Sequence, residues 1–369
     1  MVFQTLQIPD KDRLGKRGQR LPSSRLATIQ TRGAAPVLLK PQITFVCCVE
    51  SGSLESQTVR MVTSLRKHGG QFANAPIVAV TPRFGPPLSK QTHRTFDALD
   101  VTYIRRTSEF RFSWFKFLNK PLSLVMTEEF IDSEVIGFLD SDLLFVDEPE
   151  RLQLSPSEDF LGFPVECKEM ATTGPGDPYE PFWEELCRIA AIDIGDLPWV
   201  VTAQTNQRVR LYFNGGVFVY RRSSGFAKYY LDLCLRFLES GVTSKAEGYG
   251  EGIKEMSALG LAVIKLGLRW NALPYSHNYV MMTKTHSSWY EEESLRKAKI
   301  VHYHDSMWPS FFSTFQDCLL KTHPEVAQWL TSLGPMRNDA PAQWRMVSRI
   351  LATLRTRQEA AYRRSCSIA

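Results

Sequence analysis

The chain has 369 residues, of which 43% are hydrophobic, 22% charged and 11% aromatic. These proportions are typical of a globular protein with a large core, and they exclude a disordered or collagen-like chain. The sequence has no run of about 18 uninterrupted apolar residues and no apolar segment at its N-terminus, so we expect neither a transmembrane helix nor a secretory signal.

Charge is distributed unevenly along the chain. The net charge is +6 over residues 1–40 and +5 over residues 336–369, which leaves −6 for the body between them. Because the basic residues gather at the two ends, we expect no nucleic-acid partner. The seven cysteines are odd in number, and the sequence has neither a C-x-x-C motif nor an N-x-S/T glycosylation site. This pattern predicts reduced, mostly buried thiols in a cytoplasmic protein.

The elements predicted along the chain alternate between strands and helices. The apolar run at 43–49 predicts a buried strand, and the helical spacing of Val59, Val62 and Leu65 predicts a helix that ends at Gly69-Gly70. Further strands are predicted at 76–80, 101–104, 135–139, 160–163, 216–220 and 299–304, and further helices at 119–130, 181–190, 224–239, 254–266 and 341–364. This alternation predicts an α/β fold built from parallel βαβ units with right-handed crossovers.

The two ends of the chain differ from the body. Residues 1–40 are basic and lack sustained periodicity, which predicts a flexible tail. The folded domain is therefore expected over residues 41–335. Within 336–369, Val347, Ile350, Leu351 and Leu354 recur at helical spacing among many arginines, which predicts a basic amphipathic helix. Two interpretations stay open: the helix lies on an anionic membrane at its inner face, or it packs on the body with its arginines in solvent.

The strongest chemical signal is Asp140-Ser141-Asp142, directly after an apolar strand. Alternate residues of a strand face the same way, so both carboxylates are expected on one side, at the sheet edge where ligands bind. Such carboxylates suit Mg²⁺ or Mn²⁺, which in turn bridges to phosphate oxygens. The alternative is a polar exit from the strand in which aspartate caps the next turn. The apolar residues on both sides favour the first interpretation, because charges in such surroundings need partners.

Two further signals come from later strands. His302 ends a strand, with His304 two residues on, so an imidazole there is a candidate metal ligand, although a core histidine has the same pattern. Asn214-Gly215-Gly216 opens a strand; its glycines allow close approach of the backbone to a ligand, and Asn214 is able to bind a sugar hydroxyl. A simple turn into a buried strand explains this second motif equally well.

Together, these motifs resemble those of the GT-A glycosyltransferases, in particular the glycogenin-like family 8 that includes bacterial lipopolysaccharide glycosyltransferases. The resemblance spans roughly residues 43–310. It is carried by five stretches in the same order along the chain: 119–121 (NKP), 138–146 (FLDSDLLFV), 212–217 (YFNGGV), 270–274 (WNALP) and 300–303 (IVHY). It implies a three-layer α/β/α sandwich with a mostly parallel central sheet.

The resemblance also implies an activity, the transfer of a hexose from a UDP-sugar to a hydroxyl of a glycan, a lipid-linked sugar or a small molecule. By the same resemblance, Asp140, Asp142 and His302 would hold Mn²⁺ or Mg²⁺ against the diphosphate. The residues it implies at the donor are Glu50 for the nucleoside and Lys120, Asn214 and Gly215 near the diphosphate and sugar.

The chain departs from the family at two places. Where the family often has Asp-Gln beneath the anomeric carbon, this chain has Glu255-Met256, so Glu255 is the candidate substitute. The glycine and lysine that usually follow the metal histidine are also missing, and the run continues as His304-Asp305. Retention and inversion of the anomeric centre therefore both stay open. For inversion, Asp305 or Glu255 is the candidate base.

Two other functions share parts of the pattern. Met256 is compatible with a degenerate protein that binds a sugar nucleotide without turnover. Phosphatases of the haloacid-dehalogenase type also place Asp-x-Asp at the end of a strand, but their motif continues with Gly-Thr, whereas Leu143-Leu144 follows here.

Overall fold

The computed structural model describes residues 43–107, 111–244, 252–281, 290–338 and 340–368. The tail expected at 1–40 lies outside the described residues. The described residues belong to one compact unit that runs from Pro41 to Ala369.

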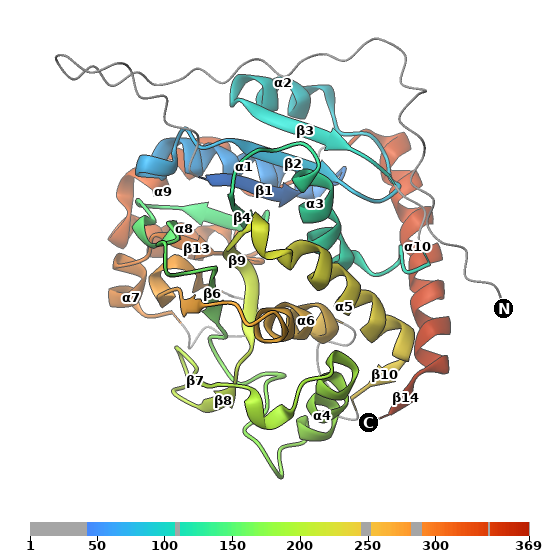
Figure 1. Cartoon of the computed structure of the whole chain (residues 1–369). Coiled ribbons are helices and arrows are strands. Elements are labelled where there is room, and N and C mark those ends of the chain that lie inside the picture. The colour runs from blue at the N-terminus through green and yellow to red at the C-terminus, as the bar shows by residue number, and fades with distance from the viewer. Residues whose placement is uncertain (1–42, 108–110, 245–251, 282–289, 339, 369) are drawn as a thin grey trace, which may run out of the picture. The chain divides into compact units, whose positions relative to one another are not determined.

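A seven-stranded sheet forms the centre of this unit (Figure 1). Its strands are β1 (Ile43–Cys48), β2 (Ile77–Thr81), β3 (Val101–Arg105), β4 (Val135–Leu139), β6 (Phe160–Pro164), β9 (Phe213–Arg221) and β11 (Trp270–Ala272). They lie in the order β11-β6-β9-β4-β1-β2-β3, and β9 runs antiparallel to the other six. The strands are rich in apolar residues throughout because both faces of the sheet are covered.

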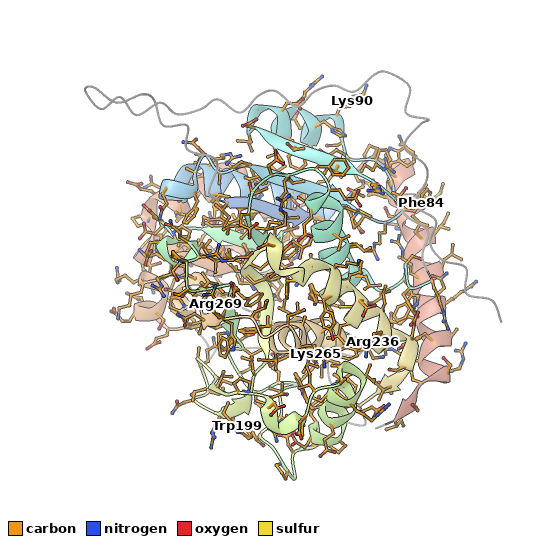
Figure 2. All side chains as sticks on the ribbon, viewed as in Figure 1. Phe84, Lys90, Trp199, Arg236, Lys265 and Arg269 are labelled. Carbon is orange, nitrogen blue, oxygen red and sulfur yellow. The ribbon has the colours of Figure 1, made fainter. Side chains whose placement is uncertain are left out.

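Helices cover the two faces of the main sheet. One face packs against α3 (Asn119–Glu128), α5 (Phe226–Ser240) and α6 (Gly252–Lys265), and the other against α1 (Ser53–His68) and α2 (Lys90–Ala98). A further helix, α4 (Glu180–Ala190), packs on α5 and α6. Side chains alternate between the faces: Val46 belongs to the first core, whereas Phe45 and Cys47 belong to the second. Figure 2 shows how densely side chains fill the space around the sheet.

A smaller sheet of three strands, β12 (Tyr279–Val280), β13 (Ile300–His302) and β5 (Leu143–Phe145), lies beside the second face. With α7 (Glu292–Arg296), α8 (Phe312–Thr322) and α9 (Pro324–Leu333), it encloses a third hydrophobic core. Three residues separate the end of β4 from the start of β5, so Asp140-Ser141-Asp142 connects the two sheets. The remaining strands form a hairpin, β7 (Trp199–Val201) with β8 (Arg208–Arg210), and a parallel pair, β10 (Val242–Thr243) with β14 (Ser367–Ile368).

Short turns of 3₁₀ helix join several of these elements, at Gly70–Phe72, Lys116–Leu118, Glu150–Leu152, Ile194–Asp196, Arg222–Ser224 and Tyr275–His277. The helix expected near the C-terminus is present as α10 (Ala342–Ser365). The sequence predicted that its apolar residues would share one face, and this is wrong. Val347 and Leu351 are half-buried, whereas Ile350 and Leu354 are 54% and 49% exposed. The inner side is held by Tyr362, whose hydroxyl accepts from Lys254 at 2.6 Å and donates to the carbonyl of Leu238 at 2.9 Å.

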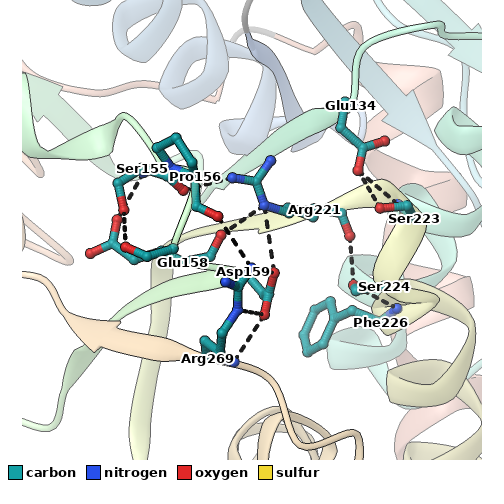
Figure 3. A network of polar contacts seen from close by, with 11 residues as sticks. Glu134, Ser155, Pro156, Glu158, Asp159, Arg221, Ser223, Ser224, Phe226 and Arg269 are labelled. Carbon is teal, nitrogen blue, oxygen red and sulfur yellow. Dashed lines mark hydrogen bonds and ion pairs between the residues drawn. The ribbon is translucent and has the colours of Figure 1, made fainter.

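A polar network closes the edge of the main sheet where β6, β9 and β11 meet (Figure 3). Asp159, just before β6, accepts from Nε and Nη2 of Arg269 at 2.7 Å each. Nε of Arg221, at the end of β9, lies 3.5 Å from the same carboxylate. One carboxylate thus joins the ends of three strands.

The predicted fold class, an α/β/α sandwich of the GT-A type with a mostly parallel central sheet, is confirmed. All seven cysteines are free, as predicted. Among the described residues, every helix is too short or too polar to cross a membrane.

Candidate active site

The strand directions bring residues that are distant in sequence to one edge of the main sheet. Asp140 follows the carboxyl end of β4, and Glu50 follows that of β1. Because β9 runs antiparallel to β4, its first residues, including Asn214 and Gly215, lie at that same edge. This is the edge at which ligands bind in open α/β sheets.

The small sheet adds a second source of side chains. β13 pairs with β5 so that His302 lies opposite Leu143, the residue after Asp142. The backbone N–H of Tyr303 also donates to the carbonyl of Asp142 at 3.0 Å. Pairing of these two strands therefore fixes the histidine against the aspartate.

Asp142, His302 and His304 form a compact group, with one potential ligand atom of each within 4.8 Å of the others. Nε2 of His302 lies 3.2 Å from Oδ1 of Asp142, and Nδ1 of His304 lies 3.7 Å from Oδ2. The two imidazoles stack with their centroids 4.0 Å apart. Behind them, Nδ1 of His302 donates to Oδ1 of Asn278 at 3.1 Å, so Nε2 is the ring nitrogen that faces Asp142.

The protonation of this group follows from burial and mutual charge. Burial disfavours the ionised carboxylate, but His302 and His304 outweigh it and hold the pKa of Asp142 well below its usual range. Burial likewise disfavours the imidazolium of His302, yet the neighbouring Asp142 raises the pKa of that histidine. Burial and the nearby His302 lower the pKa of His304 to about 3, so His304 is neutral near pH 7.

A second buried cluster centres on Lys120, in the first turn of α3. Its Nζ donates to Oδ2 of Asp140 and to the carbonyl of Gly215, each at 3.0 Å, and lies 3.9 Å from Oε1 of Glu255. Burial and the nearby Asp142 raise the pKa of Asp140, and burial raises that of Glu255. Asp140 and Asp142 therefore have different partners, the first a lysine and the second two histidines.

Glu255, in the first turn of α6, is completely buried. It accepts a short hydrogen bond from the hydroxyl of Tyr230, while its Oε2 has no hydrogen-bond partner. A Cβ built on Gly215 would lie 3.3 Å from Oε1 of Glu255 and 2.8 Å from Nζ of Lys120. The glycine thus lets the strand pass directly over this cluster.

Asn214 is held by both ends of its amide. Its Nδ2 donates to Oε2 of Glu166 at 3.1 Å, and its Oδ1 accepts from the backbone N–H of Gly216 at 2.9 Å. A Cβ built on Gly216 would lie only 2.6 Å from Cε1 of His302. Gly216 therefore makes the space that the His302 ring occupies.

Glu50 and Asp305 lie at the border of these clusters. Glu50 forms an ion pair with Arg83 and accepts from Nδ2 of Asn119 at 2.8 Å, so its carboxylate is fixed. Asp305 follows His304 directly, and its buried Oδ1 has no hydrogen-bond partner.

Sequence reasoning missed several residues that complete the site. Glu166, Tyr230, Asn278 and Arg83 hold Asn214, Glu255, His302 and Glu50 respectively. Glu166 follows the carboxyl end of β6 by two residues, and this is the same signal that identified Asp140. The other three lie on elements whose placement depends on the tertiary structure, and their local sequence carries no comparable signal.

The donor set fits a divalent cation. Carboxylate and imidazole together suit Mn²⁺, and the buried Nε2 of His304 has no hydrogen-bond partner in the described structure. Asp140, Asp142 and His302 are the ligands expected from the sequence. The geometry adds His304 to that set and pairs Asp140 with Lys120.

Residues 45–249, more than half of the chain, match the Rhodobacterales glycosyltransferase domain. The fold and this match define an enzyme of the glycosyltransferase class. The chain belongs to the Rhodobacterales glycosyltransferase domain family. The matched span includes Asp140, Asp142 and Asn214, whereas Glu255 and His302 lie beyond it. No curated protein matches the chain.

Solved structures similar to this chain include three glycosyltransferases. They are the bifunctional enzyme WbbM in its apo form (12% identity, TM-score 0.42), GlyE of Streptococcus pneumoniae TIGR4 (14%, 0.44) and the galactosyltransferase LgtC with donor and acceptor sugar analogues (12%, 0.44). The matches cover 80%, 82% and 82% of this chain and 53%, 67% and 99% of those chains, so the chain spans about half of WbbM. Because these TM-scores lie below 0.5, the family assignment rests on the domain match.

Proposed function

We propose that the protein is a metal-dependent glycosyltransferase that moves a hexose from a UDP-sugar to a hydroxyl of a glycan or lipid-linked acceptor. The observation that carries this proposal is the group of Asp142, His302 and His304 beside the Lys120–Asp140 pair, at the sheet edge where ligands bind. A divalent cation at this group would neutralise negative charge on the leaving diphosphate. Mn²⁺ fits the group better than Mg²⁺ because two of its three ligands are imidazoles.

The protein's own residues supply the remaining functions in this proposal. Glu50, fixed by Arg83 and Asn119, holds the nucleoside. Asn214, fixed by Glu166, offers its amide to a hydroxyl of the donor sugar.

Lys120 and Glu255 act at the reacting centre in this proposal. Lys120 orients Asp140 and adds positive charge near the diphosphate. The unpartnered Oε2 of Glu255 lies next to Gly215 and faces positive charge that develops at the anomeric carbon. Asp305 is the candidate base if the reaction inverts the anomeric centre.

Release of UDP from a panel of UDP-hexoses tests this function. We expect release in the presence of Mn²⁺ with at least one UDP-hexose, its loss on addition of EDTA, and its loss in Asp142→Ala. The matched control is Asp132→Ala, which removes an exposed aspartate outside the site. Release that persists in EDTA, or that requires a donor other than a uridine nucleotide, would refute the proposal.

We also propose that the outer side of α10 contacts an anionic membrane, where a lipid-linked acceptor would lie. Three large apolar side chains at i, i+4 and i+8 support this: Met346, Ile350 and Leu354 are 60%, 54% and 49% exposed. Arg349 and Arg357 lie on the same side of the helix by their spacing. Exposed apolar groups among arginines suit the surface of an anionic bilayer.

Vesicle flotation tests the membrane contact. The protein should bind vesicles that contain anionic lipid at low salt, bind neutral vesicles weakly, and dissociate as salt is raised. Ile350→Ser with Leu354→Ser should weaken binding, whereas Leu320→Ser, an exposed leucine on α8, should not. Equal binding of the double variant and the parent would remove α10 as the contact.

A further inference from the structure

We infer that His304 is a direct ligand of the cation. The protein ligands are then Asp142, His302 and His304, and Asp140 forms an ion pair with Lys120 instead of binding the cation. This inference rests on the proposed function and specifies its metal site. It differs from the ligand set expected from the sequence, in which Asp140 is a ligand and His304 has no assigned role.

The first observation is the unpartnered nitrogen of His304. The ring lies parallel to His302, with an angle of 18° between their planes, so both imidazoles present an edge to Asp142. Nδ1 of His304 lies 3.7 Å from Oδ2 of Asp142, while the buried Nε2 has no hydrogen-bond partner. A buried polar atom without a partner is destabilising, and a bound cation with its waters would supply one.

The second observation is the backbone conformation of His304. Its φ is +45°, in the left-handed region that glycine adopts readily and other residues adopt only at a cost in energy. A turn follows, in which the N–H of Ser306 donates to the carbonyl of Tyr303 at 2.8 Å. A glycine would satisfy this turn with less strain, so the presence of histidine points to a use for its side chain.

The third observation is the position of Asp140. Its Oδ2 accepts from Nζ of Lys120 at 3.0 Å, and the same Nζ is also bound by the carbonyl of Gly215. Coordination by this oxygen would require the cation to compete with a buried ammonium group. Nζ of Lys120 bonds Asp140 and Gly215 rather than either histidine, and His302 already has the outer-shell amide that metal-bound histidines use.

Two imidazoles change which ion the site prefers. Mg²⁺ favours oxygen ligands, whereas Mn²⁺ and later transition metals accept nitrogen. We therefore expect Mn²⁺ to bind more tightly than Mg²⁺ in direct competition. His304→Asp replaces a nitrogen ligand with an oxygen ligand, so it should reduce the ratio of the Kd for Mg²⁺ to the Kd for Mn²⁺.

Mn²⁺ binding to the purified protein without nucleotide, followed by the electron paramagnetic resonance signal of the free ion, tests this inference. His304→Gln should raise the Kd for Mn²⁺ by roughly tenfold or more, a loss of the size that even outer-shell changes cause. Spin-echo spectra should also show nitrogen coupling from two imidazoles in the parent and from one in His304→Gln. His93→Gln, on α2, is the control and should match the parent.

The outcomes separate this inference from the proposed function. If His304→Gln binds Mn²⁺ as the parent does, with the same nitrogen coupling, while Asp142→Ala loses the ion, the inference fails and the proposed function stands. If the parent and Asp142→Ala show the same binding of Mn²⁺, or neither binds it, the metal-dependent function fails as well. Loss of the coupling from one of the two imidazoles in His304→Gln, in a variant that still folds, supports the inference directly.

Discussion

Lys120 is the residue on which the charge balance of the site depends. It is the cation nearest to two carboxylates, that of Glu255, which is buried, and that of Asp140, which is half-buried. Replacing it with methionine leaves both without their main partner, and removal of one member of a buried ion pair costs about 3–5 kcal/mol. We expect Lys120→Met to lower the free energy of unfolding by about 3 kcal/mol, measured by urea denaturation.

The matched control for this prediction is Lys265→Met, on the exposed end of the neighbouring helix α6 (Figure 2). It should change the free energy of unfolding by about 0.5 kcal/mol or less. An equal effect of the two variants would show that the ion pairs of Lys120 contribute little to stability.

Gly216 limits the position of His302 by its lack of a side chain. In Gly216→Ala the new Cβ would lie 2.6 Å from Cε1 of His302, so the ring has to move away from Asp142. We expect this variant to lose binding of Mn²⁺ and of UDP with Mn²⁺, as measured by calorimetry. Gly260→Ala, where the nearest atom would lie 3.7 Å away, should bind both as the parent does. Normal binding by Gly216→Ala would contradict the position of His302 in the site.

At the scale of elements, Tyr362 ties α10 to the helix that carries Glu255. Its hydroxyl bonds Lys254 and the carbonyl of Leu238, and its ring packs on Trp114 with the centroids 4.9 Å apart. Tyr362→Phe keeps the ring and removes the two bonds, which we expect to lower the free energy of unfolding by about 1–2 kcal/mol. Because Lys254 precedes Glu255, kcat should fall more than KM changes. Tyr229→Phe on α5 is the control, and equal kcat values would show that α10 does not influence the site.

The network at Asp159 makes the stability of the sheet edge depend on pH. Hydrogen bonds from Arg269 lower the pKa of Asp159 to about 2, against about 3.9 in an unfolded chain. The folded state therefore gains stability from Asp159 at pH values above about 4, and it loses this contribution as the pH falls from about 4 towards 2. Asp159→Asn should have a lower urea midpoint than the parent at pH 7, and the difference should shrink at pH 3. A difference that is constant over this range would exclude Asp159 as its source.

At the scale of the whole molecule, the sequence was sufficient for the layers and for part of the site. Long apolar strands and periodic helices, such as β4 and α5, are determined by local pattern, and their positions agree with prediction. β13 lies within the strand predicted at 299–304. β12 and β5 have only two or three residues, too few for a period, and α8 and α9 were not predicted.

Asp140, Asp142 and His302 stand out because charged or polar residues interrupt apolar runs. The pairing of Asp140 with Lys120 depends on the packing of α3 against the main sheet, and that of His304 with Asp142 depends on the pairing of β13 with β5. No local sequence pattern indicates either of these tertiary contacts. The sequence also does not show which apolar side of α10 faces the body. That depends on the tertiary contact between Tyr362 and Lys254.

The central claim is that the edge of the sheet binds a uridine nucleotide through a divalent cation. Calorimetric titration of UDP into the protein, first with Mn²⁺ and then with EDTA, tests it most directly. We predict binding with Mn²⁺ that is lost with EDTA and lost in Asp142→Ala. Binding that is equally tight in EDTA, or absent under both conditions, would contradict the claim.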